Sequence, residues 1–288
     1  MVTPPRSQQE RPNTYIVQNL SQQEIQRLQF QDQMATAVLG GVLPEQEEPV
    51  RFRSVLDVAC GTGGWLIELA KAYPTVPRLV GIDISKRMLD AATVEAEAQQ
   101  VQARVTFRVM DALSRLDWPD NSFDLANLRF AASFLRAWEW PHVLRELQRV
   151  VRQGGVIRVT ESDFPEQSSS PTLLQLFRFL IQAYDMAGKS FRQQATGVSD
   201  DLAGLLEQQE VQNVQTCIYR AEVHAGTTQG QLFVEDMKYL FRTHLPFLQK
   251  WTRIPDDYEN LYEQMLRELE RPDFAVTSQV VTAWGRKA

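Results

Sequence analysis

Cysteine and long apolar runs are both scarce in this chain of 288 residues. The two cysteines, Cys60 and Cys217, are too few for a disulfide framework, and this favours a reducing compartment. No run of about eighteen apolar residues occurs, so the sequence predicts no membrane-spanning helix and no membrane partner. No histidines, cysteines and carboxylates are grouped at the spacing of metal ligands, so we expect no metal site.

Strong charge of either sign is missing as well. The formal net charge is −6, and no long basic run is present, which argues against a nucleic-acid partner. Residues 1–13 are polar and Pro-rich without a hydrophobic signal core, so we expect a flexible tail and a cytoplasmic protein. The apolar fraction of 43% supports a substantial core in one large domain, and the chain can be a monomer or a homodimer.

The most informative segment that is present runs from Val55 to Trp65. It reads as a buried apolar strand, a turn with Gly61, Gly63 and Gly64, and the start of a helix. Glycine has no Cβ, so the turn can be sharp and a ligand can approach it closely. Strand, glycine turn and helix together predict a nucleotide-type site at the carboxyl edge of a parallel sheet.

The glycine spacing argues against a dinucleotide. A dinucleotide fingerprint needs a third glycine three residues after the second, where this chain has Leu66. An acid, Asp57, instead precedes the glycines. A carboxylate at that place repels a phosphate and favours a ligand with an amino group.

Further acidic residues follow the next predicted strands. Asp83 ends the strand that begins at Arg78, about twenty residues after the glycines, where a carboxylate reaches ribose hydroxyls. Asp111 ends the strand that begins at Val105. One such acid is as often a helix cap or turn former as a ligand contact. Three acids after three successive strands favour a shared ligand.

A strand at 123–130, followed by a helix end, a turn at Gly154 and a fifth strand within 150–159, completes an alternation of strand and helix. This alternation predicts an α/β fold with a doubly wound, mostly parallel sheet. Over residues 50–161 these motifs resemble, in order, those of the class I S-adenosylmethionine (SAM)-dependent methyltransferases. The resemblance implies a seven-stranded Rossmann-like sheet and methyl transfer from SAM to a small molecule. The cofactor-binding residues that it implies are Asp57, Ala59, Gly61, Gly63, Asp83, Ile84, Asp111, Ala112, Asn127 and Leu128.

Ahead of this core, residues 14–45 are predicted to form a helical arm, with a helix over 21–40. Its Arg27 and Gln31 resemble an Arg-Leu-x-x-Gln pattern of bacterial and fungal secondary-metabolite methyltransferases. In that subgroup the helix closes over the amino-acid end of the cofactor, which implies that Arg27 and Gln31 bind it. A solvated polar edge of the helix has equal weight.

Beyond the core at 46–162, the alternation is interrupted. Residues 163–210 are predicted to form a lid insertion and a helix, and 211–288 the C-terminal strands with a second helical lid insertion. Both insertions are rich in leucine and aromatic residues. These side chains either pack the lids onto the sheet or line a pocket for an apolar or aromatic acceptor.

Candidates for catalysis are few. His224, His244, Glu161, Asp163 and Tyr15 are possible general bases, although each residue type is more often structural at such places. Arg129 ends the fourth strand, and the same subgroup often has arginine there. It can bind an acidic group of the acceptor or form a salt bridge to a lid carboxylate.

Other functions stay open on the sequence alone. A SAM-fold enzyme can catalyse cyclisation or another non-methylating reaction, or a SAM-binding protein can lack catalysis altogether. A macromolecular acceptor, protein or RNA, is a further alternative. The sequence does not decide whether oxygen, nitrogen or carbon attacks the methyl group.

Overall fold

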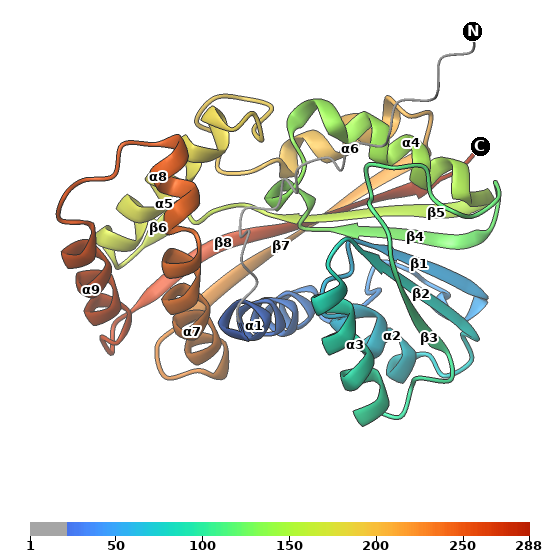
Figure 1. Ribbon diagram of the computed structural model, residues 1–288, viewed down its shortest axis with the longest axis horizontal. Coiled ribbons are helices and arrows are strands. Elements are labelled where there is room, and N and C mark those ends of the chain that lie inside the picture. Colours follow the sequence, from blue (N-terminus) through green and yellow to red (C-terminus); the bar gives the residue numbers. More distant parts are fainter. Residues whose placement is uncertain (1–21) are drawn as a thin grey trace, which may run out of the picture.

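The computed structural model describes residues 22–288, so the predicted tail and Tyr15 lie outside the described residues. A twisted sheet runs through the middle of the molecule, with helices on both faces (Figure 1). The strands are β1 Ser54–Val58, β2 Arg78–Asp83, β3 Val105–Val109, β4 Phe123–Arg129, β5 Val151–Ser162, β6 Gln167–Ser168, β7 Gln212–His224 and β8 Ala275–Arg286.

The strand order is β3-β2-β1-β4-β5-β8-β6, with β7 paired to β8. Strands β1 to β5 are parallel to one another, whereas β8 is antiparallel to β5, β6 and β7. The order of strand addition reverses at β1, because β2 and β3 lie on one side of it and β4 and β5 on the other. In open α/β sheets, this switch point is where ligands bind. The predicted fold class is confirmed.

Apolar strand residues are buried because helices cover both faces of the parallel strands. Helices α2 Gly64–Ala72 and α3 Lys86–Ala98 lie on one face, and α4 Trp140–Val150 and α6 Leu202–Glu207 on the other (Figure 1). Val55 and Leu125 face the α2 side, whereas Leu56 and Ala126 face the α4 side. This alternation holds the carboxyl end of β1 rigidly between two packed layers.

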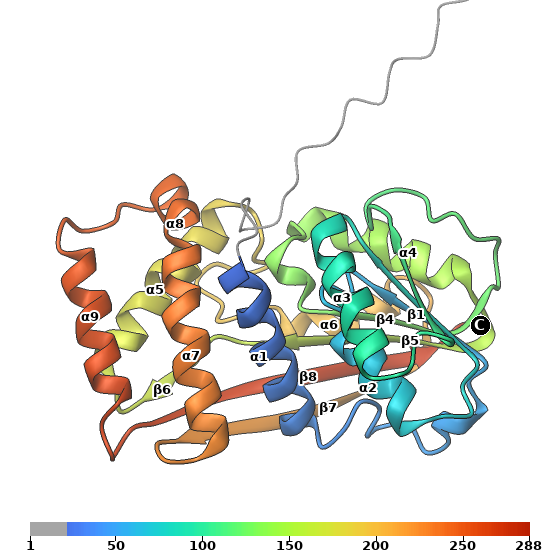
Figure 2. The ribbon, with the colours of Figure 1, turned by 60° about the horizontal axis from the view of Figure 1, so that its bottom comes forward.

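A helical subdomain covers the far half of the antiparallel strands. It consists of α5 Pro171–Met186, α7 Thr228–Thr243, α8 Leu245–Trp251 and α9 Tyr258–Leu269, which share one apolar cluster. Its aromatic rings interlock, as at Phe177 and Phe241, whose centroids lie 5.3 Å apart. Helix α1 Gln22–Leu39 lies between α7 and the glycine-turn half of the molecule (Figure 2). None of the helices in residues 22–288 has the length and apolarity to cross a bilayer.

Two local details differ from the sequence prediction. Strand β5 begins at Val151 and not, as the sequence predicts, after Gly154. A register shift between β4 and β5 opposite Phe123 allows Gly154, which has φ +70°, to lie within the strand. The polar stretch before Pro171, within the predicted lid insertion, contains the short β6, which pairs with β8. Both differences arise from pairing with distant strands, which local patterns do not reveal.

Candidate active site

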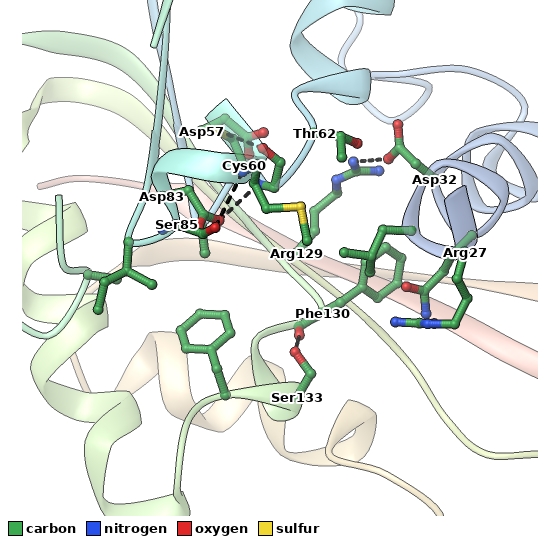
Figure 3. Close-up of a pocket in the computed structure, with 18 of the residues that line it drawn as sticks. Arg27, Asp32, Asp57, Cys60, Thr62, Asp83, Ser85, Arg129, Phe130 and Ser133 are labelled. Carbon is green, nitrogen blue, oxygen red and sulfur yellow. Dashed lines mark hydrogen bonds and ion pairs between the residues drawn. The ribbon is translucent and has the colours of Figure 1, made fainter. Parts of the chain in front are cut away.

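A cavity lies at the carboxyl ends of β1, β2 and β4, under helix α1 (Figure 3). We refer to it as the first cavity. Eleven of the predicted site residues line it: Arg27, Gln31, Asp57, Ala59, Gly61, Asp83, Ile84, Asp111, Ala112, Arg129 and His244. The tertiary structure therefore brings residues from the helical arm, four strand ends and the C-terminal end of α7 to one place.

Asp57 is the most deeply buried acid of this cavity. Its Oδ1 accepts a hydrogen bond of 2.7 Å from Asn127 Nδ2, and Asn127 Oδ1 in turn accepts one of 2.8 Å from Arg158 Nη1. Burial raises the pKa of Asp57 to about 7, against the opposing effects of Arg129 and the Asn127 bond. A cationic amine beside this carboxyl would favour its ionised form.

Asp83 closes the glycine turn. Its Oδ2 accepts a hydrogen bond of 3.0 Å from Gly61 N, and its Oδ1 one of 2.8 Å from Ser85 N. Burial raises the pKa of Asp83, and these backbone bonds oppose that rise. Each carboxylate oxygen has two lone pairs, so the turn bonds leave acceptor capacity for two hydroxyl groups.

Asp111 and Ile84 form the outer side of the cavity. Asp111 Oδ1 accepts a hydrogen bond of 2.9 Å from Leu113 N and thereby holds the turn after β3. Ile84 leaves 46% of its side chain exposed next to Asp83. An exposed apolar side chain beside a carboxylate suits a flat heterocycle with a polar edge.

The glycines of the turn have different roles. Gly61 has φ +54°, and a Cβ there would meet nothing within 4 Å, so it would project into open space. Gly63 has φ +71°, but its Cβ would lie 2.6 Å from the ring of Phe107. Gly63 does not line the cavity, so packing under the turn is the reason for glycine there.

Arg129 is buried at the other side of the cavity. Its side chain is 9% exposed, and its Nη2 forms an ion pair with Asp32 of α1 (Figure 3). Within residues 22–288, its Nε and Nη1 are buried without a hydrogen-bond partner. Buried polar groups without partners are rare and costly, so these nitrogens are suited to bind an anionic group of a ligand.

Helix α1 is fixed to α7 by a second buried ion pair. Arg27 pairs with Glu24 on its own helix at 2.8 Å and with Asp236 of α7 at 3.2 Å. Burial raises the pKa of Asp236 to about 6, which Arg27 opposes. The Arg27 and Gln31 side chains face the protein interior rather than forming a solvated edge.

A second cavity lies behind the first, between α1, α5, α7 and the ends of β5 and β8. Its walls include the apolar side chains of Met34, Phe177, Val223, Phe233 and Met237. The two cavities share Gln31, Phe130, Ser133, Phe164, Tyr184 and Leu240. They therefore adjoin at this wall, where a molecule in one can meet a molecule in the other.

Two acids at the end of β5 line the second cavity. Glu161 is 2% exposed, and burial raises its pKa to about 8 although the Ala131 and Ala132 amides oppose the rise. Asp163 instead bonds to Ser199 and to Gln279, where the Nε2–Oδ2 distance is 2.7 Å. Asp163 therefore holds the end of β5 against the segments that contain Ser199 and Gln279.

Several predicted residues lie apart from both cavities. Asn127 supports Asp57 from within the sheet, and Leu128 is fully buried in the core. His224 ends β7 with an exposed side chain. His244 does line the first cavity, and burial lowers its pKa to about 4, so it is a neutral residue at pH 7. No group of three metal-ligating side chains occurs within the described residues.

Sequence reasoning missed Asp32 and Tyr184. Asp32 lies on a helix face with other polar residues, and nothing near it in the sequence marks an ion pair to β4. Tyr184 reads as one more apolar residue of α5, yet it lines both cavities. Only the position of α5 over the sheet distinguishes it.

The first cavity fits the chemical groups of SAM. Asp57 suits the ammonium, the unpartnered nitrogens of Arg129 suit the carboxylate, and Asp83 has acceptor capacity for the ribose hydroxyls. The open space above Gly61 leaves room for the ligand.

Comparison with known proteins also indicates a methyltransferase. The family model for a methyltransferase domain matches residues 55–155. A demethylmenaquinone methyltransferase of Bacillus licheniformis is 32% identical over 173 residues, which are 56% of this chain and 72% of that protein. The enzyme with the same name in Lactiplantibacillus plantarum is 30% identical over 192 residues, covering 62% of this chain and 79% of that protein.

The fold is also similar to that of solved structures. The crystal structure of the YcgJ protein from Bacillus subtilis covers 88% of this chain and 99% of its own, with a TM-score of 0.55 and 18% sequence identity. At that identity the similarity extends to the fold alone.

Proposed function

Because the chain belongs to the class I SAM-dependent methyltransferase family, we propose that SAM binds in the first cavity and a small-molecule acceptor in the second. SAM supplies a methyl group that is already activated by the sulfonium charge. The junction of the two cavities at Phe130, Ser133 and Tyr184 supports this arrangement most directly. It offers a place where donor and acceptor can meet away from bulk water.

The roles of the cofactor residues follow from their chemistry. In this proposal Asp83 accepts hydrogen bonds from the ribose, and Asp111 and Ile84 contact the adenine. Asp57 binds the ammonium and Arg129 the carboxylate, in an environment where burial strengthens both interactions. The protein mainly orients the reactants, and a held near-attack geometry is worth about 7–11 kcal/mol.

The proposed acceptor is an apolar molecule with a ring. The second cavity is lined mainly by aliphatic and aromatic side chains, together with polar residues that include Glu161, Asp163 and Asp236. Demethylmenaquinone, which the names of the two relatives contain, is an acceptor of this kind. A short-chain demethylmenaquinol is therefore the first compound to test.

The test uses the full chain with SAM and the short-chain demethylmenaquinol, followed by mass spectrometry. We expect a product heavier by one methyl group. Met34→Trp, which narrows the second cavity, should abolish transfer and leave SAM affinity unchanged by calorimetry. Val94→Trp, at an exposed position of α3, is the control. Full activity of Met34→Trp would place the acceptor elsewhere, and a rearranged product without mass gain would indicate a non-methylating reaction.

A further inference from the structure

Glu161 is a buried carboxyl group in the wall of the second cavity, next to its junction with the first. It follows Thr160, which pairs with Arg129 across β4 and β5. The residues that follow Arg129, Phe130 to Ser133, turn around the Glu161 carboxylate. The strand that ends in the first cavity and the carboxyl group of the second are thus immediate neighbours.

The two carboxylate oxygens of Glu161 have different surroundings. Oε1 accepts hydrogen bonds from Ala131 N at 2.5 Å and Ala132 N at 3.4 Å. Phe130, at φ +56°, produces the turn that points these two amides at one oxygen. Oε2 has no hydrogen-bond partner among residues 22–288, and the residue lines the cavity. One oxygen is therefore anchored and the other is available to a ligand.

The charged groups around Glu161 come from each neighbouring element. Asp163 on the same segment raises the pKa of Glu161, in addition to burial. From α5, the Tyr184 hydroxyl is close enough for Glu161 to raise its pKa. From α7, Asp236 lines the same cavity but is paired with Arg27 of α1. No cation is paired with Glu161 in the described part of the chain, so its proton affinity is that of a buried, unpaired acid.

We propose that Glu161 is the proton acceptor for an acceptor molecule that carries an ionisable hydroxyl group, a phenol, hydroquinone or enol, on an apolar body. This inference rests on the proposed function, because it assigns the second cavity to the methyl acceptor. The hydroxyl lies against Oε2, and the apolar body lies against the side chains of α1, α5 and α7.

The proton and electron balance of the step is simple. The hydroxyl proton passes to Oε2 of Glu161, and the electron pair left on the acceptor forms the new bond to the methyl carbon. The carbon–sulfur bond of the sulfonium breaks toward sulfur, which becomes a neutral thioether. A proton then leaves Glu161 for solvent. A general base contributes about 10²–10⁴-fold to such a transfer, and it is most effective when its pKa lies near the working pH.

Other acids and bases near the junction are less suited to this role. Asp163 is occupied by Ser199 and Gln279. Burial raises the pKa of Tyr184 far above neutrality, so it is a weak source of a phenolate. His244 lines the first cavity and not the second.

A binding experiment tests the inference without turnover. The probes are 2-naphthol and naphthalene, which differ by one hydroxyl group, and binding to the full chain with S-adenosylhomocysteine is followed by ligand-observed NMR. We expect 2-naphthol to bind at least fivefold tighter than naphthalene at pH 8.5, since a charge-assisted hydrogen bond to Glu161 forms. The preference should shrink at pH 6.5, where Glu161 is protonated, and disappear in Glu161→Gln at both pH values.

The controls separate a catalytic from a structural role. Glu161→Asp keeps the carboxyl group and should keep part of the preference, and Glu166→Gln, at an exposed position nearby, should keep all of it. With the short-chain demethylmenaquinol, the rate of the wild type should rise with pH through a midpoint near 8, and that rise should be absent in Glu161→Gln.

Each result bears on a separate proposal. Equal binding of the two probes by the wild type, or an unchanged preference in Glu161→Gln, would overturn the role of Glu161. A rate that falls as the pH rises would do the same, because it would make the protonated carboxyl the active form. Failure of the wild type to bind S-adenosylhomocysteine in calorimetry would instead contradict the proposed function itself.

Discussion

Arg129, at the end of β4, forms a partly buried ion pair with Asp32 on α1, ninety-seven residues earlier in the chain. The pair closes the first cavity on the side opposite Asp83 (Figure 3). It also brings α1 against the glycine turn, since a Cβ on Gly64 would lie 2.1 Å from Asp32 Oδ2. The position of the helical arm is therefore set by the same arginine that has two unpartnered nitrogens for a ligand.

Arg129→Met should weaken S-adenosylhomocysteine binding by about 10–100-fold, because a hydrogen bond to a charged group contributes about 1.5–3 kcal/mol. Affinity for 5′-methylthioadenosine, which lacks the amino-acid part, should change little. Calorimetry with both ligands measures the difference, and Arg220→Met, at an exposed position of β7, is the control. An equal loss for both ligands would mean that Arg129 acts only by holding α1.

Gly61→Ala should mainly impair ligand binding, whereas Gly63→Ala should mainly reduce stability. Both residues have positive φ, which costs about 1–2 kcal/mol with a side chain. Gly61→Ala should stay folded but bind S-adenosylhomocysteine poorly, because its methyl group enters the cavity. Gly63→Ala should show the larger fall in melting temperature, because its methyl group meets Phe107.

The double variant Gly63→Ala with Phe107→Leu should recover part of that loss, since a smaller side chain leaves room under the turn. Thermal unfolding by circular dichroism and calorimetric binding give the two readouts. A Gly61→Ala variant that binds normally would show that this turn lies away from the ligand.

Two buried acids should stabilise the free protein as the pH falls from about 8.5 to 6.5, and one buried lysine should oppose them. Glu161 and Asp57 have folded-state pKa values of about 8 and about 7, above the values of 4.5 and 3.8 expected when unfolded. The folded state therefore binds more protons in this interval, and stability rises as protons are added. The gain from these two acids is on the order of 2 kcal/mol. Lys189 opposes it, because burial lowers its pKa to about 7 from an ordinary 10.5, so the folded state binds fewer protons at this group.

Below pH 6.5 His244 opposes this trend, because its folded-state pKa of about 4 lies below its ordinary value. Melting curves at several pH values between 6.5 and 8.5 test the prediction. Relative to the wild type, Glu161→Gln and Asp57→Asn should each lose part of the stabilisation at pH 6.5 compared with pH 8.5. A pH dependence that neither substitution changes would mean that both acids are ionised in the folded protein.

Helices α1 and α7 should exchange amide hydrogens faster than strand β1 in the free protein and slow down when S-adenosylhomocysteine is added. Their mutual contact depends on the ion pair between Arg27 and Asp236, and Arg27 lines the ligand cavity. Asp236→Asn should speed exchange in 22–39 and 228–243 and leave 54–58 unchanged. If both helices are as protected as β1 in every state, they are part of the static core and not a lid.

The sequence identifies the nucleotide half of the site because its signals are local. The acid before the glycines, the glycine turn and the acids that follow β2 and β3 are each specified within a few residues. Parallel strands then bring their ends to one edge, whatever the rest of the chain does. For this reason Asp57, Gly61, Asp83 and Asp111 all line the first cavity as predicted.

The resemblance to the methyltransferase family did not predict in which direction individual side chains point. Asn127 pairs in register with Asp57, and its amide bonds to that carboxylate instead of entering the cavity. Gly63 is restricted by Phe107 of a different strand. Which face a strand residue presents, and what lies beneath a turn, depend on neighbours that are distant in sequence.

The sequence by itself determined the doubly wound sheet, the glycine turn and the acids around it, because these depend on local periodicity and on the shared direction of parallel strands. Only the tertiary structure decided the ion pair of Asp32 with Arg129, the joining of the two cavities and the free oxygen of Glu161. Each of these depends on contacts between segments far apart in the chain. Burial then determines the pKa of Glu161 and the charge pairing of Arg129.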